Sequence, residues 1–223
     1  MNAMLSAGTT PAAPRPGLAD TPRLTDLKSA PRRSGEASFF YYDAHFRNEA
    51  VKVLPGEYFV HHEDILITTT LGSCIAACLW DRERGIGGMN HFMLPERGGA
   101  ADSGRYGSFA MELLINELIK RGATRSSMEA KVFGGAAVVS GMHSLNVGER
   151  NTSFVLDYLR TERIAVVSRD VLDVHPRKVC FLPASGKALV KRLAAVHTAS
   201  LLARESEAAR AQAPAAAGTI DLF

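Results

Sequence analysis

The stretch from Thr68 to Pro95, TTTLGSCIAACLWDRERGIGGMNHFMLP, is the most apolar part of the chain and decides how we expect it to fold. It predicts a strand over Cys74–Asp81, a turn over Arg82–Gly85 and a return strand over Gly87–Leu94. Side chains alternate along a strand, so one face of the first strand should carry Cys74, Ala76, Cys78 and Trp80.

Two side chains of this hairpin have reactive groups, Cys74 and His91, which stand 17 positions apart. A thiol needs a base to become a nucleophile near neutral pH, and a hairpin can bring the two together. Gly72 and Ser73 precede the cysteine, and backbone N–H groups in such a turn can point at a ligand. The start of a strand also lets the sulfur reach a surface cleft. The alternative is a cysteine packed in the core, which is the usual role of a cysteine in an apolar segment.

The other cysteines and the spacing of the ligands do not indicate a metal site. We interpret Cys78 and Cys180 as core residues because both lie inside predicted strands. A zinc site formed by Cys74, Cys78 and His91 is conceivable. However, a closed zinc site takes four ligands and commonly uses Cys-x-x-Cys pairs, which this chain lacks. We therefore predict no metal and no cofactor.

The composition limits the class of protein. A chain of 223 residues with 46% hydrophobic residues suits one globular domain with tails. Its net charge of +3 is spread along the chain, so we expect neither nucleic-acid binding nor a polybasic membrane patch. We also expect no membrane insertion and no signal peptide. Three cysteines do not make a disulfide framework, which favours a cytoplasmic protein with reduced thiols.

The chain divides into three parts by composition. Residues 1–36 are rich in Pro, Ala, Ser, Thr and Arg and are predicted to be a disordered leader. Residues 37–199 form the predicted domain. Residues 200–223 are Ala-rich and are predicted to be a flexible tail that ends in an apolar peptide over 219–223, either a disordered end or a tethered docking peptide.

Strands and helices alternate irregularly along the domain. Helices are predicted over Ser108–Arg121, with Ser108 as the cap, and from Asn151 onward. Further strands are predicted over Tyr58–Val60, Ile65–Thr70, Met128–Phe133, Ile164–Ser168, Arg177–Leu182 and Ala188–Leu193. This pattern predicts a single α/β domain with mixed, mostly antiparallel sheets layered with helices.

The motifs resemble one known family. The run Thr68-x-x-Leu71-Gly72-Ser73-Cys74 followed by His91-x-Met93-Leu94-Pro95 closely resembles CheD, the chemoreceptor glutamine deamidase family of bacterial chemotaxis. The resemblance extends from about Glu57 to Leu193 through Gly104-Arg105-Tyr106, Lys131-Val-Phe-Gly134-Gly135-Ala136, Asn146-Val-Gly148-Glu-Arg150-Asn151, Arg177-Lys178-Val179 and Gly186-Lys187.

The resemblance implies an activity and roles for particular residues. It implies a CheD-like fold, similar to the catalytic domains of cytotoxic necrotizing factor deamidases. Cys74 would be the nucleophile, His91 the general base and Thr68 a third residue that orients His91 through its hydroxyl or its carbonyl. The backbone at Gly72 and Ser73 would support the oxyanion. The late loop over 170–176 departs from the family, because many relatives carry a Gly-Gly pair there.

The expected reaction is hydrolysis of receptor glutamine side chains to glutamate through a thioester. The implied partners are methyl-accepting chemotaxis receptors and a CheC-type phosphatase. Three other functions stay open: an adaptor that binds receptors or CheC with little catalysis, a thiol transferase or protease, and receptor methylester hydrolysis as a side activity.

Overall fold

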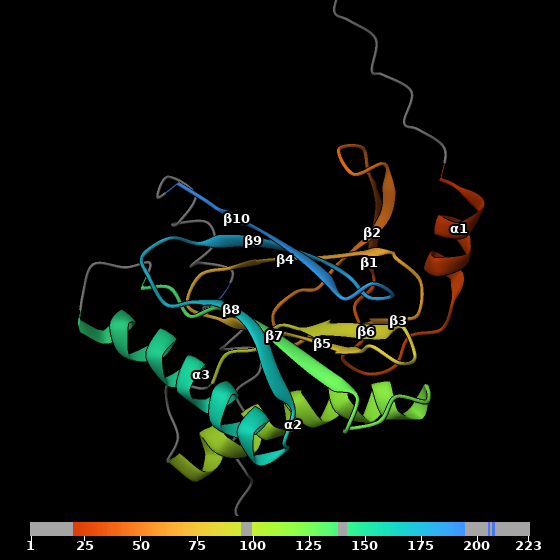
Figure 1. The fold of residues 1–223 in the computed structure, drawn as a ribbon. Coiled ribbons are helices and arrows are strands. Elements are labelled where there is room, and N and C mark those ends of the chain that lie inside the picture. The colour runs from red at the N-terminus through yellow and green to blue at the C-terminus, as the bar shows by residue number, and fades with distance from the viewer. Residues whose placement is uncertain (1–19, 95–99, 138–141, 195–204, 206, 208–223) are drawn as a thin grey trace, which may run out of the picture.

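The computed structural model describes residues 20–94, 100–137, 142–194, 205 and 207. Two five-stranded sheets lie face to face, and two long helices cover the outer face of the second sheet (Figure 1). Among the described residues, six of the eight strand pairings are antiparallel and two are parallel. The predicted α/β class with mostly antiparallel pairing is therefore confirmed.

The first sheet has the strand order β1-β2-β4-β9-β10. Its strands are β1 (Phe39–Asp43), β2 (Asn48–Lys52), β4 (Leu66–Leu71), β9 (Arg177–Leu182) and β10 (Lys187–Arg192). Strand β4 lies at the centre, parallel to β2 and antiparallel to β9. Its residues Ile67 and Leu71 are buried in the apolar layer between the two sheets.

The second sheet has the strand order β3-β6-β5-β7-β8. Its strands are β3 (Tyr58–His61), β6 (Ile86–Asn90), β5 (Ile75–Asp81), β7 (Met128–Gly134) and β8 (Ala165–Val171). The predicted hairpin forms β5 and β6 in the middle of this sheet. The return strand ends at Asn90, four residues earlier than predicted, although Phe92 still pairs with Ile75.

Two apolar layers hold these parts together. The layer between the sheets receives Cys74, Ala76, Cys78 and Trp80, so the predicted alternation is confirmed. The other face of β5 carries Ile75, Ala77 and Leu79 into a layer beneath the helices α2 (Ala100–Lys120) and α3 (Met142–Thr161). All three cysteines are buried and free.

Both helices begin earlier than the sequence predicted. Helix α2 runs through Ser108, and α3 begins nine residues before Asn151. Gly107 in α2 and Gly148 in α3 lie at close contacts with neighbouring segments. A Cβ on Gly107 would collide with Phe154, and one on Gly148 would collide with the backbone of Gly135. Tertiary packing thus outweighs the low helix propensity of glycine.

The ends of the chain are described only in part. Residues 1–19 of the predicted leader lie outside the described residues, while α1 (Pro22–Ser29) follows them, capped by Thr21 and packed against β1 with Leu24 buried. Of the predicted tail, Glu205 and Glu207 are described, and both are helical. The predicted docking peptide over 219–223 lies outside the described residues.

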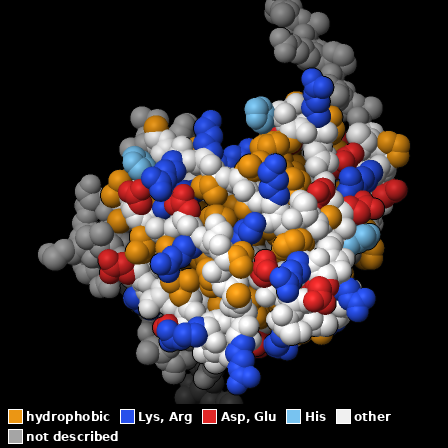
Figure 2. Space-filling view, in the orientation of Figure 1, with side chains coloured by type: hydrophobic (Ala, Val, Ile, Leu, Met, Phe, Trp, Pro, Cys, Tyr) orange, Lys and Arg blue, Asp and Glu red, His pale blue; other side chains and the backbone are white. Residues whose placement is uncertain are grey.

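One face of the molecule is mixed in charge. On the face drawn in Figure 2, basic and acidic side chains are interspersed with apolar ones. Among the described helices, none has the length and apolar character needed to cross a membrane.

Candidate active site

Cys74 lies in the short connection between β4 and β5, directly before the first residue of β5. All three carbonyl groups of this connection accept hydrogen bonds from residues outside it. Gly72 accepts a hydrogen bond from the N–H of Ala136 (2.8 Å), and Cys74 accepts one from the N–H of Gly135 (2.8 Å). The Ser73 carbonyl accepts one from the Asn151 side chain (2.9 Å). These hydrogen bonds fix the turn that carries Cys74 relative to Gly135, Ala136 and Asn151.

The Gly134-Gly135 turn fits closely behind the cysteine. Gly134 has a φ of 114°, and a Cβ there would collide with the Cys74 carbonyl oxygen. Only glycine combines that backbone conformation with such a close approach. Asn151 adds a second link, since its Oδ1 accepts a hydrogen bond from the N–H of Leu94 (2.9 Å). One buried amide thus joins the cysteine turn to the segment after His91.

His91 follows β6 and is held through its main chain. Its N–H donates to the Glu57 carbonyl (3.0 Å), and its carbonyl accepts from the N–H of Gly56 (2.7 Å). Next to it, Phe92 and Ile75 exchange two backbone hydrogen bonds of 2.9 Å. This pairing places His91 beside Cys74, and a ring nitrogen lies within 4.8 Å of the sulfur. The structure therefore brings the two predicted residues together.

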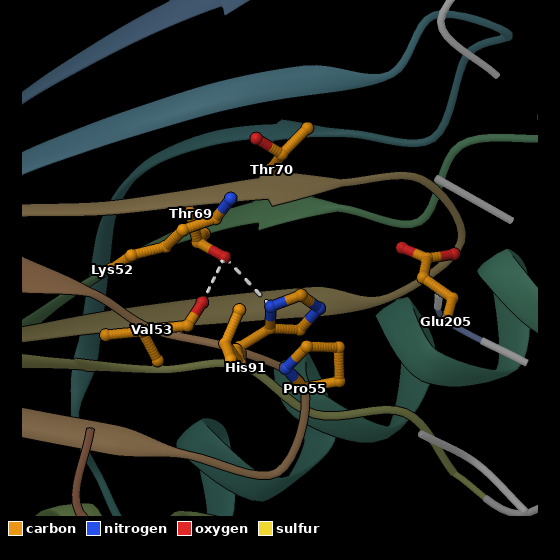
Figure 3. Close-up of a pocket in the computed structure, with 8 residues that line it drawn as sticks. Lys52, Val53, Pro55, Thr69, Thr70, His91 and Glu205 are labelled. Carbon is orange, nitrogen blue, oxygen red and sulfur yellow. Dashed lines mark hydrogen bonds between the residues drawn. The ribbon is translucent and has the colours of Figure 1, made fainter. Parts of the chain in front are cut away.

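Thr69 orients the imidazole of His91. Its hydroxyl lies 2.8 Å from Nδ1 of the ring and donates to the Val53 carbonyl at 2.8 Å (Figure 3). A hydroxyl has one proton, so with that proton on Val53 it accepts a hydrogen bond from Nδ1–H. This tautomer leaves Nε2 as the basic nitrogen. In Figure 3 the ring lies between Thr69 on one side and Glu205 on the other.

The structure gives this contact to Thr69 rather than to Thr68. Successive residues of β4 face opposite sides of the sheet. The Thr68 hydroxyl accordingly lies 3.0 Å from the Tyr41 hydroxyl and donates to the Val51 carbonyl at 3.3 Å. The Thr68 carbonyl accepts from the N–H of Val53 (2.9 Å). Sequence reasoning missed Thr69, although the alternation of β4 contained the signal.

Glu205, from the predicted tail, reaches into the same site. Its carboxylate accepts hydrogen bonds from the N–H of Gly72 (2.7 Å) and from the N–H (3.1 Å) and hydroxyl (3.0 Å) of Ser73. Glu205 is only 2% exposed, and Cys74 is fully buried rather than open to a cleft. No pattern in the Ala-rich tail distinguishes this glutamate from its neighbours. We call the three donors of Gly72 and Ser73 the amide cradle.

The surroundings keep the thiol protonated. Burial raises the pKa of the Cys74 thiol well above its usual value, and the Glu205 carboxylate raises that pKa further by charge repulsion and by a hydrogen bond with the thiol. Tyr106, from the Gly-Arg-Tyr motif, also lies near the sulfur. Burial, together with the charge that Cys74 would carry, raises the pKa of Tyr106 to about 12.

A pocket borders this site at His91 and Glu205. It is lined by Lys52, Val53, Leu54, Pro55, Thr69, Thr70, His91 and Glu205. His91 and Glu205 thus share the lining of this pocket with residues of β2, β4 and the segment after β2 (Figure 3).

The late loop over 170–176 is hydrogen-bonded to the 134–137 segment that packs against the cysteine turn. Leu172 and Asp173 have φ values of 64° and 71°, the left-handed conformation that glycine prefers. Leu172 donates to the Gly134 carbonyl (2.8 Å), and Asp173 accepts from the N–H of Ala137 (2.8 Å). Two residues of the loop other than glycine therefore adopt a backbone conformation that glycine prefers.

The site residues include types that bind metals. Ligand atoms of Cys74, His91 and Glu205 lie within 4.8 Å of one another. However, the carboxylate already accepts three hydrogen bonds from the amide cradle, and a closed zinc site takes four ligands. The donors suit an anion better than a cation, so we interpret the group as a thiol and a base beside a bound carboxylate.

The fold and the site together define an α/β protein with a thiol–imidazole pair beside an anion-binding cradle. Comparison with known proteins gives the family. The model of the family described as "CheD chemotactic sensory transduction" matches residues 93–192. "Probable chemoreceptor glutamine deamidase CheD 1" of Albidiferax ferrireducens is 62% identical over 203 residues, covering 90% of this chain and 87% of the relative. "Probable chemoreceptor glutamine deamidase CheD" of Janthinobacterium sp. (strain Marseille) is 52% identical, covering 84% and 95%.

The chain belongs to the CheD family, and the resemblance drawn from its motifs is confirmed. Among solved structures, the Bacillus licheniformis hypothetical protein YfiH overlaps 52% of the chain with a TM-score of 0.37 and 10% identity. That likeness is too distant to bear on the fold or the function.

Proposed function

We propose that this protein deamidates glutamine side chains of chemoreceptors, with Cys74 as nucleophile and His91 as general base. The observation that carries the proposal is the site itself. A thiol, an imidazole nitrogen and a glutamate carboxylate lie within 4.8 Å of one another, and glutamate is the product of glutamine deamidation. The names of the relatives supply the substrate class, the chemoreceptor.

The first half of the reaction forms a thioester. Nε2 of His91 takes the thiol proton of Cys74, and the thiolate attacks the side-chain amide carbon of glutamine. The N–H groups of Gly72 and Ser73 donate to the oxyanion, and one such donor is worth about 3 kcal/mol. The imidazolium then gives its proton to the departing nitrogen, the C–N bond breaks and ammonia leaves.

The second half releases glutamate. A water molecule gives a proton to Nε2 of His91 and attacks the thioester carbon, and the C–S bond breaks as the thiol is restored. Thr69 accepts from Nδ1–H throughout, which keeps the imidazole in the tautomer that both halves require. The role of Thr68 as a third site residue remains a prediction.

The place and partners of the reaction follow from the substrate. We place the enzyme in the cytoplasm, where the modified part of the receptor would lie, and we keep a CheC-type phosphatase as a proposed partner. Methylester hydrolysis is a proposed side activity of the same thiol.

The test uses the cytoplasmic domain of a receptor as substrate. We expect the wild-type protein to add about 1 Da at each modified glutamine, because an oxygen replaces an NH group, and to release ammonia. Cys74→Ala should do neither, while Cys78→Ala, a core cysteine on the same face of the strand, should retain the activity. Full activity in Cys74→Ala would refute the proposal, and cleavage of the receptor backbone would indicate a protease.

A further inference from the structure

Glu205 occupies the site in the manner of a bound ligand. It lies more than a hundred residues from Cys74 in the sequence, yet its carboxylate takes every donor of the amide cradle. A Cβ on Gly72 would come within 2.9 Å of that carboxylate, so the cradle is shaped closely around it. Such a fit is typical of a binding site and its occupant.

The chemistry of the occupant matches that of the expected product. A glutamate side chain differs from glutamine by one oxygen in place of one NH₂ group. The carboxylate of Glu205 therefore has the shape and the acceptor atoms of a deamidated glutamine. It also lies beside the thiol that would have attacked the amide carbon.

Resting on the function proposed above, we infer that Glu205 is a product analogue held within the same chain. Its carboxylate fills the subsite that receives the side-chain carboxamide of substrate glutamine. The ligand class of this subsite is the γ-carboxamide or γ-carboxylate of a glutamyl side chain. Substrate must displace Glu205 before Cys74 can react.

Two consequences follow from the competition between Glu205 and substrate for one subsite. While Glu205 is bound, Cys74 is shielded from solvent and its thiolate is disfavoured by the adjacent negative charge. The apparent affinity for substrate is also reduced, because it equals the affinity of the open subsite multiplied by the fraction of molecules in which the subsite is open. Because the competitor is tethered, its effective concentration can reach about the millimolar range.

The experiment compares full-length wild type with Glu205→Ala and with a matched control, Glu207→Ala. Glu207 is an exposed helical glutamate two residues away. For each protein we would measure the rate of iodoacetamide modification at Cys74 by peptide mass spectrometry, and the initial rate of receptor deamidation. The buried thiols of Cys78 and Cys180 report loss of the fold in the same spectra.

We expect Glu205→Ala to raise both rates by about tenfold or more, with Cys78 and Cys180 unchanged and Glu207→Ala equal to wild type. Equal Cys74 modification in wild type and Glu205→Ala would overturn the inference. The inference would also be overturned if a metal chelator made Cys74 of the wild type react faster with iodoacetamide, because a bound cation would then be the cause of the protection.

The outcomes also separate this inference from the proposed function. Faster thiol modification in Glu205→Ala, with no receptor deamidation by any variant, would overturn the proposed activity and the product analogy but leave Glu205 as the occupant of the cradle. Receptor deamidation that is equally fast in all three proteins, with equal thiol modification, would overturn the inference alone.

Discussion

Two parts of the chain meet at the amide cradle, and they are held there in different ways. The hairpin with Cys74 and His91 is fixed by burial between layers and by backbone pairing of Ile75 with Phe92. For Glu205, the described hydrogen bonds are those that its carboxylate accepts from Gly72 and Ser73. Hydrogen bonds to a charged group contribute about 1.5–3 kcal/mol each, which a substrate can replace with its own. The chemistry is therefore built into the core, whereas the occupant is exchangeable.

The largest effect is expected on the hairpin side of this comparison. His91→Gln should slow receptor deamidation by about 10²–10⁴-fold, because both proton transfers lose their carrier. It should leave the shielding of Cys74 by Glu205 in place, since no cradle donor comes from His91. The measurements are initial rates by mass spectrometry and iodoacetamide modification of Cys74. A loss below tenfold would show that another group is the base.

The next effect concerns Asn151, which links the turn that carries Cys74 to the segment after His91. Asn151→Ala removes the partners of the Ser73 carbonyl and the Leu94 N–H, both inside the protein. We expect the free energy of unfolding in urea to fall by about 2–4 kcal/mol. Asn116→Ala, at an exposed position of α2, is the control and should change it little. Equal effects of the two variants would mean that Asn151 does not hold the cysteine turn.

A smaller effect separates the two threonines of β4. Thr69→Val removes the acceptor of His91 Nδ1–H and should lower the deamidation rate by about tenfold, the equivalent of one ordinary hydrogen bond. Thr68→Val removes a hydroxyl that contacts Tyr41 and should have a smaller effect. A larger loss in Thr68→Val would restore the role that the family resemblance implies for Thr68.

The smallest effect lies in the loop behind the site. Leu172 has a left-handed backbone and is 38% exposed, so Leu172→Gly should raise the free energy of unfolding by about 0.5–1 kcal/mol. Leu189 has a similar exposure, 37%, but lies in β10. Leu189→Gly should therefore lower that free energy, since glycine weakens a strand. The same sign for both, measured in urea, would contradict the backbone explanation.

The two parts also differ in how far the sequence could predict them. The hairpin follows from apolar alternation, and its cysteine and histidine stand at marked positions beside glycines. The identity of Thr69 was within reach, because Ile67 and Leu71 place it on the apolar face of β4. The early starts of α2 and α3 could not be predicted from the sequence. Glycine is typical of loops, and the contacts that keep Gly107 and Gly148 inside helices appear only in the fold. Glu205 had no local signal, because only the fold brings it to Gly72.

The central claim is that Cys74 attacks a side-chain carboxamide seated in the amide cradle, and Glu205→Gln tests it within one molecule. This variant places a carboxamide where the structure has a carboxylate. We expect the purified protein to convert it to glutamate, gaining about 1 Da at position 205, and to keep the amide when Cys74→Ala is added. Retention of the amide in a preparation that deamidates receptor, or its equal loss without Cys74, would contradict the account.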